Sequence, residues 1–484
     1  MKWLARIFRK RAAAPLAPPV FLTNTLSGAK ELFIPQKPGL ALLYTCGPTV
    51  YSRQHIGNLR SGVLSDTLAR VLTAAGYRVH RVINITDVGH LTGDADEGED
   101  KMALGAAREG RSPADIAKRY TKMFIDDLHE LNVDTNDIRF PRATDYIDEQ
   151  IALAKTLEEK GFAYRLPSGL YFDTSRFPGY GKLGNIAGAA LKSGARVAPA
   201  AGKRHPSDFA LWRTAKPGDL QQWESPWGRG NPGWHIECSA MSRALLGAEI
   251  DIHTGGEDLA MVHHNDEIAQ SEAASGRPFV RYWLHNAFLT MGGEKISKSL
   301  GNEVYLSDIG AKGFPPLSLR YFFLQAHYRT PLSFSWEALG AAAGALERLW
   351  NAAREAAEES GRRGAPSDAR RRFLIAMRDD LATPQALGIL WEALRSEDYT
   401  PEEKWGLIEE ADAHFGLSLA AAPAAKRIPE EELPREVREL LERRTAARKG
   451  KDFAEADRLR GELWERGYRV DDGPEGPVLT KDSL

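Results

Sequence analysis

Cysteine is scarce in this chain: only two of its 484 residues are cysteines, Cys46 and Cys238. So few thiols cannot build the disulfide framework of a small secreted protein. Long apolar runs are also missing, because no segment approaches the ~20 residues that a transmembrane helix needs. The formal net charge is only −2, so no global attraction to nucleic acid or anionic lipid is expected. These absences predict a cytoplasmic protein with no membrane partner.

The order of the predicted elements indicates an α/β domain followed by helices. Residues 40–46 form an apolar run that predicts a buried strand, residues 59–76 an amphipathic helix, and residues 77–88 a second strand. Strand–helix–strand opens a parallel sheet, whose ligands bind at the carboxyl ends of the strands. Residues 164–233 are rich in glycine, proline and basic residues with little periodicity, which predicts an insertion. From Leu317 onward the pattern predicts a separate helical bundle.

Both cysteines fit one metal site. Cys46 ends the first predicted strand, and Cys238 lies in the segment WHIECSAM. His263 and Glu267 are four residues apart in a predicted helix, which places them on one face. Two cysteines, a histidine and a carboxylate suit tetrahedral zinc, and His264 serves almost as well as His263. The alternative is that the cysteines are ordinary buried core residues and that the histidine and glutamate form an ordinary helix pair.

Two further segments suit a phosphate ligand. His55, Gly57 and Asn58 open a helix directly after the first strand, where free backbone N–H groups and the helix dipole favour an anion. The segment TMGGEKISKSLGN carries Lys295 and Lys298 in a loop with glycines on both sides, and lysines act as point charges for phosphate. Taken separately, the first segment is also explained as a capped strand–helix turn and the second as a solvated charged loop.

Together these segments resemble the class I aminoacyl-tRNA synthetases, and within that class the cysteinyl-tRNA synthetase family. Residues 55–58, HIGN, resemble the HIGH signature, and residues 295–299, KISKS, resemble the KMSKS signature. The family-specific segments are TCGPTVY, NITDV, PGWHIECSAM, HTGGEDL followed by HHNDEIAQSEA, and KDFAEADRLRGEL near the C-terminus. The resemblance begins at about Phe21 and covers the rest of the chain.

The resemblance implies a Rossmann-type parallel-sheet catalytic domain with an inserted connective peptide, an α-helical bundle and a small C-terminal anticodon-binding domain. The predicted parts are a basic N-terminal extension (1–20), the first half of the catalytic domain (21–160), the connective peptide (161–233), the second half with the KISKS loop (234–316), the bundle (317–425) and the C-terminal tRNA-binding domain (426–484). The extension lacks the apolar core of a signal peptide and is interpreted as a disordered or weakly helical segment, or as an arm that touches membrane or RNA. Family resemblance also suggests a monomer.

The resemblance also implies a role for individual residues. One zinc ion per chain is held by Cys46, Cys238, His263 and Glu267. Contacts to the substrate cysteine come from Gly47, Thr86, Trp234, His235 and Asp258. Asp258 suits the substrate ammonium, whereas the ring of Trp234 is as well explained by core packing. ATP, with Mg²⁺, is bound by His55, Gly57, Asn58, Lys295, Ser297 and Lys298, of which His55, Asn58 and the two lysines are the predicted catalytic residues.

The implied reaction activates L-cysteine with ATP to cysteinyl-adenylate and pyrophosphate, and then transfers the cysteinyl group to the 3′-end of tRNA(Cys). Zinc would explain the selection, because it binds a thiolate far better than the hydroxyl of serine, which a hydrophobic pocket rejects poorly. One alternative is a ligase that joins cysteine to a small amine, as in mycothiol synthesis, without a long tRNA-binding part. Another is a non-catalytic paralogue that binds tRNA or zinc. Asn58 replaces the second histidine of HIGH, which predicts slower adenylation.

A local basic run is the candidate tRNA surface. It lies in a predicted helix near the C-terminus and comprises Arg443, Arg444, Arg448, Lys449 and Lys451. Trp464 and Tyr468 follow, and they either stack on anticodon bases or pack within the protein. The alternative for the basic run is a surface helix laced with Glu–Arg pairs.

Overall fold

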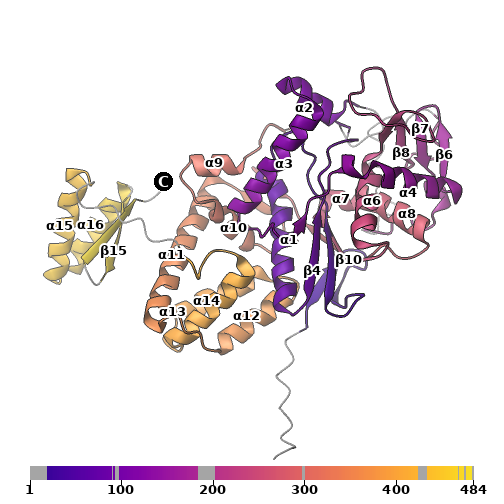
Figure 1. The fold of residues 1–484 in the computed structure, drawn as a ribbon. Helices are drawn as coiled ribbons and strands as arrows, with labels where there is room; N and C mark the ends of the chain where they lie inside the picture. The colour runs from indigo at the N-terminus through magenta and orange to yellow at the C-terminus, as the bar shows by residue number, and fades with distance from the viewer. Residues whose placement is uncertain are drawn as a thin grey trace, which may run out of the picture.

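The structure is a computed structural model that describes residues 19–89, 91–92, 98–183, 202–296, 300–422, 433–466, 468–473 and 476–481. Ser297 and Lys298 of the predicted nucleotide site lie outside these ranges, as does most of the predicted N-terminal extension. Figure 1 shows a sheet domain beside a helical bundle, and a small C-terminal unit set apart from both.

A five-stranded parallel sheet lies at the centre of the domain, in the order β11-β10-β3-β4-β5. Its strands are β3 (Leu40–Thr45), β4 (Arg78–Ile83), β5 (Ile138–Arg139), β10 (Ile250–Gly256) and β11 (Val280–Asn286). Successive side chains of β3 alternate between the faces: Leu43 packs in the core that contains α1 (Ile56–Ala74), and Tyr44 in the core that contains α6 (Trp234–Leu246). Helices therefore cover both faces, and the predicted α/β fold is confirmed.

The predicted second strand is shorter than expected. It ends at Ile83, and the chain continues through Asn84 to Asp87 as a loop. Thr86 of this loop forms an isolated bridge with Thr49, which follows β3. The loops after β3 and β4 therefore run side by side at the carboxyl edge of the sheet, where ligands of parallel sheets bind.

The predicted connective peptide, residues 161–233, contains an antiparallel sheet in the order β6-β7-β8-β9, although residues 164–233 were expected to show little periodicity. Its strands are β6 (Ala163–Leu166), β7 (Gly169–Phe172), β8 (Phe209–Thr214) and β9 (Gly230–Pro232). Phe172 and Leu211 pack on side chains of α4 (Ile147–Glu159) and α6. The strands escaped the sequence analysis because each has only three to six residues, too few to display a period.

The remaining elements of the catalytic half surround the sheet. They are β1 (Phe21–Asn24), β2 (Ala29–Leu32), α2 (Lys101–Glu109), α3 (Pro113–Glu130), the 3₁₀ helices Ala143–Tyr146 and Thr174–Arg176, α7 (Glu257–Met261), α8 (His263–Ser275), β12 (Leu289–Met291), β13 (Glu294–Lys295), α9 (Leu306–Ala311), α10 (Pro316–Leu324) and β14 (Leu332–Phe334). Strands β13, β12 and β14 form a small sheet of their own. The hairpin β12–β13 leads into the KISKS segment.

The helical bundle contains α11 (Trp336–Ser360), α12 (Asp368–Arg378), α13 (Thr383–Arg395) and α14 (Pro401–Phe415). The C-terminal unit contains α15 (Arg435–Lys449), α16 (Phe453–Glu465), β15 (Tyr468–Gly473) and β16 (Gly476–Lys481). At the end of the chain, β15 and β16 form an antiparallel hairpin that packs on α15 and α16. Within the described ranges, no helix is both long enough and apolar enough to cross a membrane.

A buried ionic cluster joins the sheet domain to the bundle. Asp66 of α1 is 0% exposed and accepts hydrogen bonds from Arg70 (2.7 Å) and from Arg320 of α10 (2.5 Å). Arg320, also 0% exposed, donates in addition to the carbonyl of Phe415 at the end of α14. Arg81 of β4 lies 3.5 Å from the other oxygen of Asp66. This carboxylate therefore pairs with one arginine of its own helix and with two arginines from other elements, β4 and α10.

Candidate active site

The residues predicted to hold zinc lie together. Cys46 follows β3, Cys238 lies in α6, and His263 and Glu267 lie one turn apart in α8. One donor atom from each side chain lies within 4.8 Å of all the others. The two Sγ atoms are 3.9 Å apart, Cys46 Sγ lies 3.6 Å from Glu267 Oε1, and His263 Nε2 lies 3.1 Å from the same oxygen.

These separations fit a tetrahedral metal ion. With Zn–S distances near 2.3 Å, two sulfur ligands of a tetrahedron stand about 3.8 Å apart, and mixed pairs stand slightly closer. The observed separations agree with this geometry, since the two sulfurs are 3.9 Å apart, the sulfur and oxygen 3.6 Å, and the nitrogen and oxygen 3.1 Å. The donor set also matches the ligands that zinc prefers, since it combines two thiols, an imidazole and a carboxylate.

His264 is a second histidine at the same cluster. A set of Cys46, His253, His264 and Glu267 also brings its donor atoms within 4.8 Å of one another. His264 Nε2 lies 3.4 Å from Cys46 Sγ, and its Nδ1 lies 2.8 Å from His285 Nε2. This second set contains only one thiol, whereas the set with His263 uses both. The geometry therefore brings both histidines to the cluster, and thiol content favours His263.

The charges of the cluster are unbalanced without a cation. Hydrogen bonding from Cys46 lowers the pKa of Cys238 to about 6, whereas burial and the contact with Cys238 raise the pKa of Cys46 well above its ordinary value. Burial would raise the pKa of Glu267, but the charge of His253 and hydrogen bonds from His253 and His263 outweigh it and lower the value to about 2. A divalent cation would let both thiols ionise beside this carboxylate.

Trp234 and His235, at the start of α6, lie against the cluster. The rings of Trp234 and His263 have centroids 4.4 Å apart, and His235 Nδ1 lies 2.8 Å from His263 Nδ1. The other nitrogen of His235 lies 3.2 Å from Asp266. This chain of contacts orients the ring of His263 and leaves its Nε2 toward the candidate metal ligands.

Gly47 and Thr86 are held together by Asn84. The side chain of Asn84 accepts a hydrogen bond from Gly47 N (2.8 Å) and donates one to Thr86 Oγ1 (3.2 Å). A Cβ atom at Gly47 would lie 1.7 Å from the carbonyl oxygen of Asn84, so only glycine fits there. Both predicted substrate contacts therefore lie at the sheet edge directly after Cys46.

The HIGN segment begins α1 as expected. His55 is the N-cap residue, and the helix has neither a side-chain cap nor an acidic residue in its first turn. A Cβ atom at Gly57 would lie 3.0 Å from the ring of His55 and 3.8 Å from Leu289 of β12. The helix start, which suits an anion, therefore lies beside the hairpin that carries Lys295.

Lys295 and Asp258 form an ion pair in this structure. Lys295 Nζ lies 2.9 Å from Asp258 Oδ2 and 4.1 Å from the ring centroid of Phe288. Both side chains are about half-exposed, at 42% and 48% respectively. The first lysine of KISKS thus contacts the carboxylate that the sequence assigned to the substrate ammonium.

Comparison with known proteins identifies the family. A model described as the class I (C) tRNA synthetase catalytic domain matches residues 32–344, and the cysteinyl-tRNA ligase anticodon-binding domain matches residues 430–476. The chain is 48% identical over 472 residues to cysteine–tRNA ligase 1 of Burkholderia lata, which covers 95% of this chain and 97% of that protein. This chain belongs to the cysteinyl-tRNA synthetase family.

Other relatives agree with this assignment. Cysteine–tRNA ligases of Chlorobaculum tepidum and Thermococcus gammatolerans are 43% and 41% identical to this chain, each over 95% of it and 98% of their own length. Methionyl-tRNA synthetase of Mycobacterium tuberculosis in complex with methionyl-adenylate shares the fold, with a TM-score of 0.54 and 18% identity over 80% of this chain and 92% of that chain. The resemblance inferred from the sequence is confirmed.

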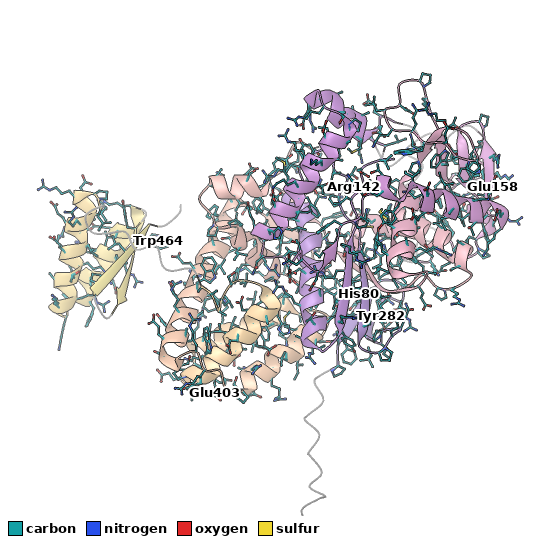
Figure 2. The ribbon with its side chains drawn as sticks, viewed as in Figure 1. His80, Arg142, Glu158, Tyr282, Glu403 and Trp464 are labelled. Atoms are coloured by element: carbon teal, nitrogen blue, oxygen red, sulfur yellow. The ribbon has the colours of Figure 1, made fainter. Side chains whose placement is uncertain are left out.

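In this member of the cysteinyl-tRNA synthetase family, several arginines of the C-terminal unit form ion pairs within the unit. Arg443 and Arg458 each form an ion pair with Glu455, and Arg444 is only 2% exposed. Arg443 and Arg458 thus show the Glu–Arg pairing of the alternative interpretation, whereas Arg444 is buried. Trp464 of α16 is 54% exposed (Figure 2), whereas Tyr468 packs against the apolar core of the unit. Stacking of Trp464 on a base stays a prediction.

Arg60 and Glu237 are buried charged residues near the site that were not predicted from the sequence. Arg60 of α1 is 2% exposed and donates hydrogen bonds to the carbonyls of Ala287 (2.7 Å), Phe288 (3.0 Å) and Thr330 (2.9 Å). It thereby fixes the start of the HIGN helix against the chain that enters the β12–β13 hairpin. Glu237 of α6 is fully buried, and burial raises its pKa well above the ordinary value. In the sequence, each of these charged residues stands on a helix whose neighbouring positions are apolar. That pattern could have marked them as buried charges.

Replacing Arg60 with methionine is expected to lower the free energy of unfolding by about 2–4 kcal/mol, because the carbonyls of Ala287, Phe288 and Thr330 lose their donor. The KM for ATP is also expected to rise, since the hairpin loses its attachment to the HIGN helix. Urea denaturation and pyrophosphate exchange measure the two effects. Arg243→Met, at an exposed position of α6, serves as the control and should change neither quantity. Equal behaviour of the two variants would contradict the role of Arg60.

Proposed function

We propose that this protein is a cysteine–tRNA ligase that activates L-cysteine with ATP and transfers the cysteinyl group to the 3′-end of tRNA(Cys). The observation that carries the proposal is the cluster of Cys46, Cys238, His263 and Glu267 at the sheet edge beside the HIGN helix. The names of the relatives support the same activity. We place the reaction in the cytoplasm, in a monomer without a membrane partner.

In the first step, the cysteine carboxylate attacks the α-phosphate of ATP in line, and pyrophosphate leaves. His55 and Asn58, at the N-terminus of α1, would donate hydrogen bonds to the phosphates, and Gly57 would let the nucleotide approach the backbone. Lys295 and Lys298, with Ser297, would neutralise the departing pyrophosphate, whose charge Mg²⁺ also shares. Lys295 must leave Asp258 to do so. In the second step, a terminal hydroxyl of the tRNA takes the cysteinyl group.

Zinc, held by Cys46, Cys238, His263 and Glu267, would supply a Lewis acid that selects a thiolate over a hydroxyl. Gly47, Thr86, Trp234 and His235 would surround the bound amino acid, since they lie against the cluster. His253, which lies 3.0 Å from the second oxygen of Glu267, would orient that carboxylate toward the metal. The proposed contact between Asp258 and the substrate ammonium competes with the ion pair to Lys295.

The proposal is tested by cysteine-dependent exchange of pyrophosphate into ATP, with serine as the control substrate, followed by charging of tRNA(Cys). We expect exchange with cysteine, little with serine, and subsequent aminoacylation. Absence of exchange with cysteine would leave only a non-catalytic tRNA- or zinc-binding role. Exchange without tRNA charging would instead favour a ligase that joins cysteine to a small amine. The anticodon-binding match at residues 430–476 supports tRNA as the acceptor.

Replacing Asn58 with histidine is expected to raise the rate of adenylate formation by about tenfold, because a protonated histidine makes a charge-assisted bond to phosphate that a neutral amide cannot. Single-turnover formation of cysteinyl-adenylate measures the change. Asn136→His, at an exposed loop position, is the matched control and should leave the rate unchanged. An unchanged rate in the Asn58 variant would show that this side chain does not contact the phosphates.

A further inference from the structure

Asp380, at the corner between α12 and α13, has a strained backbone conformation. Its φ is +58° and that of the next residue, Leu381, is +54°, in the left-handed region that residues other than glycine rarely adopt. Both residues are buried, at 4% and 2% exposed. Such a conformation costs free energy and persists only where the surrounding contacts hold it. The partners of Asp380 therefore show what this corner of the bundle is fixed against.

Every polar group of Asp380 has a partner, and these partners lie outside α11–α14. The carboxylate accepts hydrogen bonds from Thr23 N (2.8 Å), Thr23 Oγ1 (2.5 Å) and the hydroxyl of Tyr328 (2.7 Å). The N–H of Asp380 donates to the carbonyl of Phe21 (2.9 Å), and its carbonyl lies 2.8 Å from His327 Nε2. The corner is thus joined to β1 on one side and to the segment between α10 and β14 on the other.

The segment between α10 and β14, residues 325–331, contacts both parts of the proposed nucleotide site. The carbonyl of Tyr328 accepts a hydrogen bond from Ala287 N (2.9 Å), just before β12. Strand β14, which follows the segment, pairs in parallel with β12. On the other side, Arg60 of the HIGN helix donates to the carbonyl of Thr330 (2.9 Å). The segment therefore links the HIGN helix to the β12–β13 hairpin that leads into KISKS.

Apolar packing around this segment is incomplete. A pocket lies between α1, α10 and the corner after α12, and its mostly apolar lining includes Val63, Phe323 and Leu381 beside Arg60 and Tyr328. Side chains that line a pocket lose part of their van der Waals contacts. Packing alone thus fixes the segment less firmly here, and its position depends more on the hydrogen bonds of Arg60 and Tyr328.

We infer that Asp380 is a positioning residue through which the bundle sets the place of the KISKS hairpin beside the HIGN helix. This inference rests on the proposed function, in which Lys295 of that hairpin acts on the phosphates of ATP. The hydrogen bond from Tyr328 transmits the effect, because it joins the strained corner to the segment that contacts Arg60 and β12. The bond from Thr23 Oγ1 joins the same carboxylate to β1 instead. Phosphate-binding groups that are already in place lose less entropy when ATP binds.

The test uses two variants that each remove one hydroxyl from Asp380, Tyr328→Phe and Thr23→Val. Both side chains are 7% exposed, so both variants should be destabilised to a similar extent in urea denaturation. In pyrophosphate exchange, we expect Tyr328→Phe to raise the KM for ATP at least about fivefold and to leave the KM for cysteine within about twofold. Thr23→Val should leave both KM values within about twofold of those of the unmodified chain.

Hydrogen exchange measured by mass spectrometry gives a readout that does not depend on activity. We expect the amides of residues 286–295 to exchange faster in Tyr328→Phe and at an unchanged rate in Thr23→Val, because only the first variant loosens the attachment of the hairpin. The double variant Tyr328→Phe, Arg60→Met should raise the KM for ATP by less than the product of the two single effects, since both side chains hold the same segment.

Equal KM values for ATP in Tyr328→Phe and Thr23→Val would overturn the inference, because Asp380 would then have only a structural role. Unchanged exchange of residues 286–295 in Tyr328→Phe would also overturn it, as would independent effects of Tyr328→Phe and Arg60→Met. If the unmodified chain does not exchange pyrophosphate with cysteine, the proposed function fails. The hydrogen-exchange comparison would in that case still decide whether Asp380 positions the hairpin.

Discussion

Replacing Cys238 with serine is expected to reduce bound zinc from about one ion per chain to nearly none, and to lower cysteine-dependent pyrophosphate exchange by at least about 100-fold. The physical reason is that a serine hydroxyl does not ionise at neutral pH and is a poor ligand for zinc. The chain has only two cysteines, so no other thiol can replace the lost ligand. Elemental analysis by mass spectrometry and the exchange assay measure the two effects.

The two histidines of the cluster give a matched pair for this prediction. His263→Asn is expected to lose the metal, whereas His264→Asn should retain it, because the set with His263 contains both thiols. Zinc removal by a chelator should abolish the preference for cysteine over serine, and zinc added back should restore it. Full zinc content in Cys238→Ser would rule out this site. Metal loss in the His264 variant alone would assign the site to the second set of residues.

Replacing Asp66 with asparagine is expected to lower the free energy of unfolding by about 3–5 kcal/mol, because the change leaves buried arginines without their counter-charge. Arg320 is fully buried and donates a hydrogen bond of 2.5 Å to Asp66. Without this partner, its guanidinium would not be hydrated in the folded state. The cluster spans α1, β4 and α10, and its loss weakens the junction between the sheet domain and the bundle. Urea denaturation, monitored by tryptophan fluorescence, measures the change.

The same carboxylate predicts a pH dependence. Burial would raise the pKa of Asp66, but the charges of Arg320, Arg70 and Arg81 outweigh it and lower the pKa below its ordinary value of 3.8. A lowered pKa in the folded state stabilises the protein above the unfolded pKa, and this stabilisation is lost as pH falls through the folded pKa. Between pH 5 and pH 3, the unmodified chain should therefore lose more stability than Asp66→Asn.

Asp126→Asn is the control for both measurements. Asp126 pairs with Lys122 on the surface of α3, where both side chains are at least 49% exposed. Such a pair contributes about 0–1 kcal/mol, so its removal should barely change the free energy of unfolding. If Asp66→Asn and Asp126→Asn destabilised the protein equally, the buried cluster would have no special role in joining the domains.

Much of the fold could be predicted from local sequence. The apolar run before Cys46 became β3, because an unbroken run of apolar residues is typical of a strand buried on both faces. The segment after Asn58 became α1, because it is long enough to show a helical period. The short strands of the insertion and the C-terminal hairpin could not be predicted in this way. Their side chains are buried by contacts with distant helices such as α4, α6 and α16, which local periodicity does not report.

Some features of the candidate site could likewise be predicted from the sequence, and others are seen only in the structure. The four-residue spacing of His263 and Glu267 already placed both on one helix face, and the two rare cysteines were obvious candidates as ligands. The sequence left undecided whether His263 or His264 reaches the cluster. The folded chain shows that His264 also reaches it, through a contact with Cys46. The ion pair between Lys295 and Asp258 was not foreseen, because the two residues are 37 positions apart and on different elements.

By itself, the sequence determined the family, the α/β class and the chemical identity of the predicted ligands, since motifs and periodicity are local properties of a chain. Only the tertiary structure decided which charges lose their water and which partners they meet. Asp66 meets Arg70 on its own helix, Arg81 on β4 and Arg320 on α10. Burial and pairing depend on contacts between segments far apart in the chain, and so they follow from the packing of the whole protein.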